Sequence, residues 1–305
     1  GASTMAAIQE GSWVLLTLSS GEKQLARLRR GAVARSGRAR IKLDPIIGAP
    51  SGGLFLVHDN ELIYDERTSE EMDEVVARIA GEGGSGSSNA QLVDDGLAQS
   101  LDAAQIKRLK TNGASGEEVL RALATSSKTF AGKTAFSQEK YLKKKAKKHM
   151  QWLTASAPTA LSIVDMHTAK SPEKVLGLRR DTLSILLSLS NAQPHARVLV
   201  LDGMQGLLIG AIAQRLGGDG ALLAANVHGP SLGALEWLNL SARTIGVVRS
   251  CTLLKLLAAQ IALENGAKVQ NGAKVENGAK VTREKEGAAP VEGAEAGAGA
   301  AHGAG

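Results

Sequence analysis

The chain has little cysteine and few aromatic residues. Its single cysteine, Cys251, excludes an internal disulfide and a cysteine-based metal site, which fits a reducing compartment. Aromatic residues make up 3% of the 305 residues, and this argues against a nucleic-acid surface built from many stacking platforms. The six histidines show no ligand spacing, so we expect no metal site.

Long apolar runs are also missing. The longest ones are well below the roughly 18 residues that a transmembrane helix needs, so we expect no membrane association. No charged stretch followed by an apolar core opens the chain, so no secretory signal is predicted. The hydrophobic fraction of 43% is still enough for the cores of one large or two ordinary domains.

Positive charge is abundant and is concentrated in two places. The formal net charge is +6. Between Lys23 and Lys42 there are eight basic residues and no acidic one, and between Lys133 and Lys148 there are seven lysines and one glutamate. Neither cluster adjoins an apolar stripe of tryptophan and phenylalanine, so both favour a nucleic-acid partner over a lipid surface.

The second cluster is predicted to be a helix over residues 136–149, with Ser137 as N-cap. Leu142, Ala146 and Met150 share an apolar face that could pack against the protein. Like charges on one face repel each other, and a polyanion would relieve this repulsion and release counterions. A solvated basic helix or a nuclear localisation signal is the alternative. Another face carries five lysines, which are Lys140, Lys143, Lys144, Lys147 and Lys148. Lys145 lies next to this face.

Residues 1–64 are predicted to form a small β-barrel. Short alternating segments separated by glycine-rich turns support this prediction, with strands expected at 13–18, 24–28, 39–43, 53–58 and 62–64. An ordinary solvated barrel surface is the alternative to an RNA-facing one. Because no acidic residue lies between Lys23 and Lys42, the RNA-facing surface is favoured. The candidate RNA contacts are Arg27, Arg29, Arg30, Arg38 and Arg40.

Residues 65–150 are predicted to hold a linker and then helices. The linker, 65–90, contains an acidic stretch at 70–74 that favours a short helix, and a flexible Gly/Ser-rich stretch at 81–88. The helical segment, 91–150, is expected to start with a helix over 101–110, capped by Ser100. A second helix starts at Ser115, which forms a capping-box pattern with Glu118.

Residues 151–263 are predicted to form a Rossmann-like α/β domain with a parallel sheet. Strands are expected at 159–164, 197–201, 221–227 and 244–248, with helices at 181–189, 206–216 and 232–240. The strand over 197–201 is expected to be buried. From residue 264 a six-residue repeat and a Gly/Ala/Glu-rich composition predict a disordered tail through 305.

The turn after the strand 197–201 has the position of a cofactor turn but not its residues. A Rossmann-type site needs small residues there and an acidic residue at the end of the second strand, where it binds ribose hydroxyls. Met204 and Leu207 are bulky, and Asn226 stands where the acid is expected. The turn is therefore interpreted as structural, with Asp202 and Gly206 as its remaining cofactor-type residues.

Several short motifs occur in one order: Leu92 to Leu101, Gly113 to Val119, and Lys133 to Lys145. This ordered set resembles the non-catalytic, tRNA-binding subunit of the eukaryotic tRNA (adenine-N1-)-methyltransferase. The resemblance implies a nuclear protein that keeps a class I methyltransferase fold without a functional cofactor site. It also implies a catalytic partner that binds S-adenosylmethionine, in a heterotetramer with two copies of each subunit. This complex methylates N1 of an adenine in the tRNA T-loop.

Two alternatives stay open. The first is a general RNA-binding scaffold without a methyltransferase partner, because the family has also been described as an RNA-binding component associated with translation initiation. A methyltransferase active on its own is the other, and the glycine turn and Asn226 argue against it. About 60 residues separate the turn from the repeat tail, too few for a full seven-strand sheet, so an incomplete second domain is expected.

Overall fold

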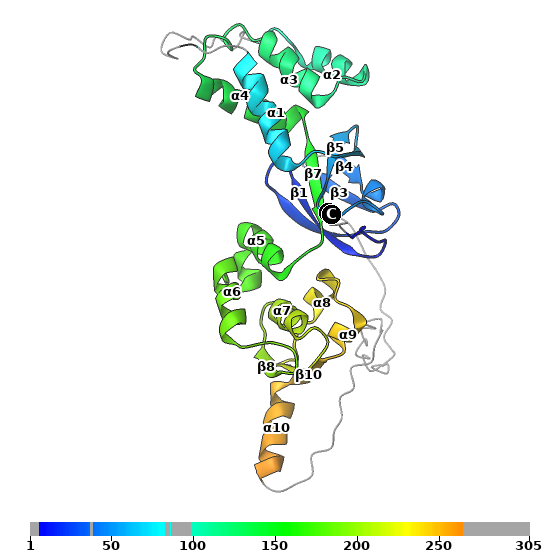
Figure 1. Ribbon diagram of the computed structural model, residues 1–305, viewed down its shortest axis with the longest axis vertical. Coiled ribbons are helices and arrows are strands. Elements are labelled where there is room, and N and C mark those ends of the chain that lie inside the picture. Colours follow the sequence, from blue (N-terminus) through cyan, green and yellow to red (C-terminus); the bar gives the residue numbers. More distant parts are fainter. Residues whose placement is uncertain (1–5, 37–38, 83–85, 87–98, 265–305) are drawn as a thin grey trace, which may run out of the picture.

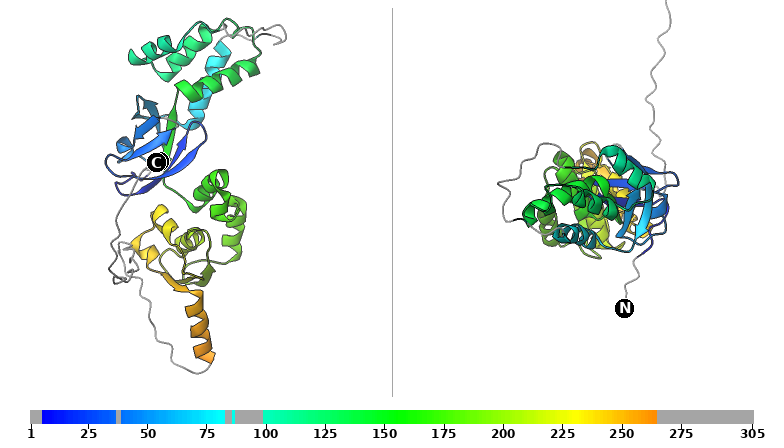
Figure 2. Two further views of the ribbon diagram at one scale, coloured as in Figure 1. Left: turned by 180° about the vertical axis from the view of Figure 1, so that it is seen from behind. Right: turned by 90° about the horizontal axis from the view of Figure 1, so that it is seen from above.

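The computed structural model describes residues 6–36, 39–82, 86 and 99–264. These residues form an elongated molecule in which a helical module, a central sheet and an α/β unit follow one another along the long axis (Figure 1). The view from behind shows the same order (Figure 2). Arg38 and the predicted tail after residue 264 lie outside the described residues.

The central sheet is antiparallel and has the strand order β2-β1-β7-β5-β6. The chain enters it through β1 and β2, adds β5 and β6, and returns after the helical module to place β7 in the middle. The range predicted for the second domain, 151–263, therefore begins with a strand of the first sheet. The strands are β1 (Trp13–Leu18), β2 (Lys23–Arg27), β5 (Gly53–His58), β6 (Glu61–Asp65) and β7 (Trp152–Ser156).

The predicted small barrel is not found in the part of the chain that the structure describes. β2 and β6 end the five-stranded sheet on opposite sides instead of pairing with each other. A separate two-stranded ribbon, β3 (Val33–Ser36) with β4 (Ala39–Lys42), covers part of its core. Strand positions came from local alternation, but closure depends on long-range pairing, and β7 was not among the predicted strands.

The helical module is inserted between β6 and β7. It begins with α1 (Ser69–Glu82), which is capped by reciprocal hydrogen bonds between Thr68 and Glu71. This helix runs well beyond the short acidic segment that was predicted, and it includes the first two residues of the stretch 81–88 that was expected to be flexible. The other helices are α2 (Ala103–Thr111), α3 (Gly116–Thr125) and α4 (Ala135–His149).

Capping explains where the helices of the module begin. α3 starts at the predicted capping box of Ser115 and Glu118, so that prediction is confirmed. The predicted N-cap Ser100 is wrong, because Asp102 caps α2 through a box with Gln105. The predicted N-cap Ser137 is also wrong: the N-cap position of α4 is Thr134, three residues earlier. Hydroxyl residues at both positions made the sequence signal ambiguous.

The second unit contains a three-stranded parallel sheet with the order β10-β9-β8. Its strands are β8 (Arg197–Leu201), β9 (Ala221–Asn226) and β10 (Val248–Thr252). Helix α7 (Leu207–Leu216) covers one face and is almost wholly buried. The predicted parallel α/β arrangement is thus confirmed. The remaining helices are α5 (Ala160–Lys170), α6 (Arg180–Leu189), α8 (Gly233–Trp237), α9 (Ala242–Ile245) and α10 (Leu253–Glu264).

Three sequence predictions in this unit are wrong. Residues 159–164 form the start of helix α5 instead of a strand, because Thr159 and Ser162 make a capping box. The strand predicted at 244–248 begins at Val248, after the short helix α9. β8 is not buried, because it is an edge strand whose Leu199 and Leu201 are 56% and 63% exposed.

The sheet and the second unit are joined by a specific contact. The side chain of Asn239 accepts a hydrogen bond from the backbone N–H of Trp13 and donates one to its carbonyl, both at 2.8 Å. Trp13 also meets the ring of Trp237 edge-on, with centroids 6.5 Å apart. An ion pair between Lys170 and Glu22, 2.7 Å, adds to the contact. These interactions fix how the two parts sit together.

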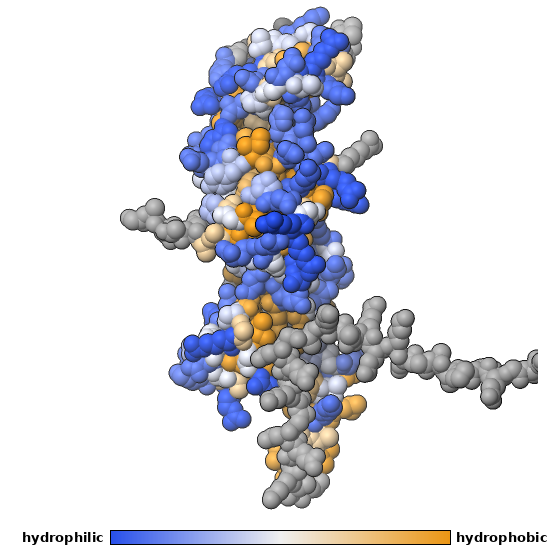
Figure 3. Space-filling model, turned by 90° about the vertical axis from the view of Figure 1, so that its right-hand side faces the viewer, coloured by the Kyte–Doolittle hydropathy of each residue, from blue (hydrophilic) through white to orange (hydrophobic). Residues whose placement is uncertain are grey.

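Side-chain polarity divides the molecule. In the face shown by Figure 3, hydrophilic residues dominate the helical module, whereas apolar residues gather over the second unit and its α10 end. No described helix is long and apolar enough to cross a bilayer.

Candidate RNA-binding surface and the cofactor-type turn

Helix α4 carries its lysines outward. Lys140, Lys143, Lys144, Lys147 and Lys148 are all exposed. Only Lys143 has an ion-pair partner among the described residues, Glu139 at 2.6 Å. The other four positive charges of this face are left without a described carboxylate partner. We call these five residues the lysine face.

The opposite side of α4 is anchored in a hydrophobic core. Leu142 is fully buried and Met150 is 4% exposed, and both pack in a cluster with residues of α1 and α3. Ala146 packs against the same cluster. The predicted apolar face of this helix is therefore confirmed. Because the apolar face of the helix is packed in this core, the position of its charged face is fixed relative to the rest of the module.

Lys145 differs from the lysine face. It is half-buried, and its ammonium lies 5.4 Å from the ring centroid of Tyr141. The Lys133 ammonium lies 4.9 Å from the same ring. The Tyr141 hydroxyl donates to the side-chain oxygen of Gln99 at 2.8 Å. Lys145 therefore has a cation–π partner within the protein, and it belongs to the packing of the module as well as to its charge.

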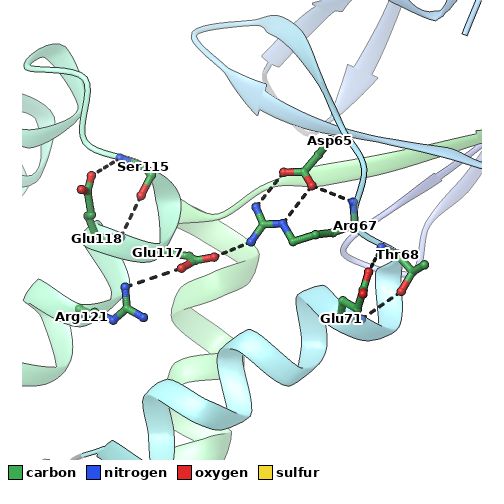
Figure 4. Close-up of polar contacts among 8 residues, drawn as sticks. All are labelled: Asp65, Arg67, Thr68, Glu71, Ser115, Glu117, Glu118 and Arg121. Atoms are coloured by element: carbon green, nitrogen blue, oxygen red, sulfur yellow. Dashed lines mark hydrogen bonds and ion pairs between the residues drawn. The ribbon is translucent and has the colours of Figure 1, made fainter.

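An arginine ties the module to the sheet. Arg67, just after β6, donates to both oxygens of the Asp65 carboxylate, at 2.9 and 2.7 Å, and reaches Glu117 on α3 at 2.6 Å (Figure 4). Glu117 also pairs with Arg121 at 3.6 Å. The guanidinium lowers the pKa of Asp65, mainly through its hydrogen bond. This network sets the direction in which the module and its lysine face point.

Several cations of the basic run between Lys23 and Lys42 have carboxylate partners, although no acidic residue lies within the run itself. Acids from distant parts of the chain pair with four of its cations, at 3.5–3.9 Å. Arg27, for example, reaches Glu236 of the second unit at 3.8 Å and donates from Nε to the carbonyl of Gly11. Arg30 reaches Glu10 at 3.7 Å. These exposed pairs are long, and such pairs contribute only about 0–1 kcal/mol each.

Among the predicted arginines of this run, two keep an unpaired charge in the part of the chain that the structure describes. Arg29 and Arg40 are exposed and have no carboxylate within ion-pair distance there. The run thus offers isolated cations, whereas α4 offers a continuous row. The lysine face is therefore the stronger candidate for a polyanion contact.

In the cofactor-type turn, a side chain of the turn itself takes the backbone hydrogen-bond donors that a ligand would need. Asp202 is 3% exposed, and its carboxylate accepts hydrogen bonds from the backbone N–H groups of Met204, Leu208 and Ile209 at the start of α7. In a helix of this kind these N–H groups are the ones available to an anionic ligand. Here a carboxylate of the chain itself already occupies them.

Gly206 is packed against the next loop of the chain. Its φ is +85°, and a Cβ at this position would lie 2.5 Å from the carbonyl oxygen of Ser231. Met204 and Leu207, which sequence patterning marked as too bulky, are both buried in the core of the unit. The loop after β9 therefore lies directly on the turn, where a cofactor would need close approach to the backbone.

Asn226 also has a structural role. Its side-chain amide donates to the carbonyl of Asp202 at 3.0 Å, and its side-chain oxygen accepts from the N–H of Val227 at 2.6 Å. The residue at the end of β9 thus ties the two strand ends together. Together with Asp202, it makes a self-contained junction between β8, β9 and α7.

A sequence profile of the Gcd10p family matches residues 7–286, which is most of the chain. The chain belongs to the Gcd10p family. The resemblance seen in the short motifs is thereby confirmed. The family match covers the sheet, the helical module with α4, and the second unit, so the lysine face and the closed turn both lie within the matched region.

Two relatives in this family carry the same description. A Dictyostelium discoideum protein described as tRNA (adenine(58)-N(1))-methyltransferase non-catalytic subunit is 32% identical over 227 residues, covering 74% of this chain and 44% of that protein. The Mus musculus protein of that description is 32% identical over 216 residues, covering 71% and 42%. The chain thus spans less than half the length of these relatives.

One solved structure is also similar. A SAM-dependent O-methyltransferase from Thermotoga maritima aligns over 80% of this chain and 56% of its own, with a TM-score of 0.37 and 11% sequence identity. A similarity of that extent carries no argument about function.

Sequence reasoning missed two residues beside the lysine face. Lys110 lies in the last turn of α2 and His149 ends α4, and both line one cavity. Burial, with further contributions from Lys110, Lys148 and Lys145, lowers the pKa of His149 to about 4. The basic run around His149 was the only sequence signal for this effect, and Lys110 is too far away in sequence to be associated with it.

The low pKa of His149 predicts an acid-sensitive module. Below its ordinary pKa of 6.5 the unfolded chain gains a proton at this position, but the folded chain gains it only near pH 4. Stability should therefore fall between pH 6.5 and 4, by at most about 3 kcal/mol from this group. Chemical denaturation across this range tests it. His149→Gln should flatten the dependence, and an unchanged profile would contradict the assignment.

Proposed function

We propose that this chain is a non-catalytic, tRNA-binding subunit of a tRNA (adenine-N1-)-methyltransferase, which holds the tRNA for T-loop methylation by a catalytic partner. The observation that carries the proposal is the lysine face on α4, a fixed row of exposed cations with a single described ion pair. The names of the family relatives support the same reaction. Phosphate contacts position an RNA without reading its sequence, so this role suits a row of lysines.

The partner is a catalytic subunit that binds S-adenosylmethionine, and we propose two copies of each subunit in the complex. Several large apolar side chains are exposed on the second unit, and this supports a protein partner, because apolar residues gathered at a surface mark interaction sites. The compartment we propose is the nucleus, which fits the basic run of α4 as an import signal. The exposed apolar residues of this surface include Leu199, Leu201, Val227, Leu254 and Ile261.

The chain itself should not bind S-adenosylmethionine. Asp202 occupies the helix N-terminus, Asn226 replaces an acid, and the Ser231 loop lies on Gly206. Calorimetric titration with S-adenosylmethionine should give no saturable heat. A micromolar dissociation constant would contradict this prediction and would favour the alternative of a methyltransferase active on its own.

A methylation assay tests the function directly. The chain alone and the catalytic subunit alone should each leave tRNA unmodified or nearly so, whereas the two together should form 1-methyladenosine. Co-purification supplies the second readout. A chain that binds tRNA but recruits no methyltransferase subunit would instead be the general RNA-binding or initiation-associated scaffold.

A further inference from the structure

A cavity of about 580 Å³ lies where helix α4 ends. The β5–β6 hairpin, the turn between α2 and α3, and the last residues of α4 form its walls. Its volume falls within the range of about 300–1,000 Å³ that is usual for sites that bind small organic groups. Nothing in the closed turn of the second unit contributes to it.

Both apolar and polar side chains line the cavity. Leu56, Ile63, Met72 and Met150 supply the apolar walls. The polar side chains come from the β5–β6 hairpin, the segment after β6, the end of α2, the start of α3 and the end of α4, so they converge on one space. An apolar cleft with a few convergent polar groups is the usual form of a ligand site. The polar lining residues are His58, Asp59, Arg67, Lys110, Ser115, Glu117, His149 and Gln151.

Most of these polar groups are already engaged. Figure 4 shows the Arg67 guanidinium turned toward Asp65 and Glu117, and Ser115 in its capping box, so neither is free for a ligand. Lys110 differs, because no carboxylate lies within ion-pair distance of it among the described residues. Its pKa is lowered, mainly by burial and further by Lys148, although Asp59 opposes this. The charge of Lys148 on α4 therefore acts on that of Lys110 on α2.

His149 adds a neutral ring. With a pKa of about 4 it is uncharged at neutral pH, so it offers one donor and one acceptor on a flat surface. No hydrogen bond to another described residue engages its imidazole. Such a group can lie against a nucleobase and hydrogen-bond with its edge, which is how proteins usually recognise unstacked RNA bases.

The cavity lies at the C-terminal end of the helix that carries the lysine face. His149 is the last residue of α4, directly after Lys147 and Lys148. An RNA strand that follows the lysine face therefore reaches the mouth of the cavity at the end of the helix. A free metabolite would need no such row of cations leading to its site.

We propose that this cavity binds one unstacked nucleotide of the RNA held by the lysine face. The base enters the apolar cleft beside His149 and Gln151, and its phosphate is placed between Lys110 and Lys148. This inference rests on the proposed RNA-binding function and names the part of the RNA that the site takes. It assigns a binding role to Lys110, which lies outside the lysine face.

Matched lysines on α2 test the proposal. Lys110→Gln and Lys107→Gln each remove one charge from the same helix, but Lys107 is exposed and lies outside the cavity. Binding is measured with the full chain to a tRNA and to a fully paired RNA duplex of similar length. Lys110→Gln should weaken tRNA binding at least about fivefold, and Lys107→Gln less than about twofold. On the duplex the two variants should behave alike.

A second variant tests the cavity at a position where a substitution should not disturb folding. Ile63 is 55% exposed on β6, so Ile63→Asp should leave the fold intact while placing a negative charge at the apolar wall. It should also weaken tRNA binding selectively, with an unchanged circular dichroism spectrum. Equal effects of the two α2 variants on tRNA would overturn the nucleotide site.

The failure of the proposed function looks different. If the chain did not bind tRNA, or if lysine-face variants bound it normally, the RNA-binding function and this site would both fall. If only the cavity variants behaved normally, the function would stand without the site. Free adenosine monophosphate serves as a third probe. Saturable binding below about 100 µM would indicate a metabolite site and would overturn the RNA assignment.

Discussion

A chain with Lys140→Gln, Lys144→Gln and Lys147→Gln is expected to bind tRNA with a log–log salt slope reduced by about two to three. Each phosphate contact contributes roughly 0.7 to 0.9 to this slope, because it releases condensed counterions. These three lysines are exposed and lack described ion-pair partners. Lys143 is left unchanged because Glu139 already pairs with it, so its loss would be partly offset. Glutamine keeps the helix propensity high.

Affinity should fall alike for all tRNAs, because phosphate contacts carry no sequence information. Assembly with the catalytic partner should persist, since Leu142 and Met150 on the buried side of α4 are untouched. Fluorescence anisotropy at several salt concentrations gives the slope. A lost partner with an unchanged slope would instead make α4 an assembly element.

The control removes the same charge elsewhere. Lys174→Gln, Arg243→Gln and Lys255→Gln together take three exposed cations from the second unit. If net charge alone governed binding, both triple variants would change the slope equally. If the lysine face is the contact, the control should change it by less than about one. This comparison separates a local surface from a general effect of a basic protein.

Local patterns in the sequence predicted local structure well. The strands at Trp13–Leu18 and Gly53–His58 were predicted with the bounds that the structure shows, because alternation and glycine turns mark them. The lysine helix was predicted from a 3.6-residue period and an uninterrupted run. Its N-cap was misplaced by three residues, since Thr134 and Ser137 both carry a hydroxyl that suits this position.

Long-range features could not be predicted in this way. The barrel prediction failed because β7, far along the chain, enters the middle of the first sheet and leaves its edges apart. The unbalanced basic run gains Glu10, Asp165 and Glu236 as partners only through folding. The 159–164 prediction failed because β-branched residues and a capping box compete in one short segment. Which of these signals prevails is decided by tertiary packing.

For the cofactor-type turn, some features could be predicted from the sequence and others could not. Sequence reasoning identified Met204, Leu207 and Asn226 as departures from a cofactor site, and the structure gives each of them a packing or hydrogen-bonding role. It could not show that Asp202 would cap α7 or that the Ser231 loop would lie on Gly206. The first contact depends on how the turn bends back onto α7, and the second joins residues 25 positions apart in the sequence.

Gly206→Ala is expected to destabilise the second unit by about 2–5 kcal/mol. The backbone there has φ +85°, which costs an L-residue about 1–2 kcal/mol, and the new methyl group would lie 2.5 Å from the carbonyl oxygen of Ser231. The turn would have to move away from the loop, which is packed against the start of α7. In this interpretation the glycine is needed for contact within the protein and not for a cofactor.

Gly229→Ala is the matched control for this effect. Its φ is +86°, nearly the same, but a Cβ there would meet nothing within 4 Å. It should therefore cost only the backbone strain of about 1–2 kcal/mol. Urea denaturation of the two variants isolates the steric part as their difference, which we expect to exceed about 1 kcal/mol. Equal destabilisation would mean that the Ser231 loop yields easily, and a loop that yields could open the turn to a cofactor. The predicted lack of S-adenosylmethionine binding would then lose its main support, because only a firmly packed loop keeps the backbone of the turn covered.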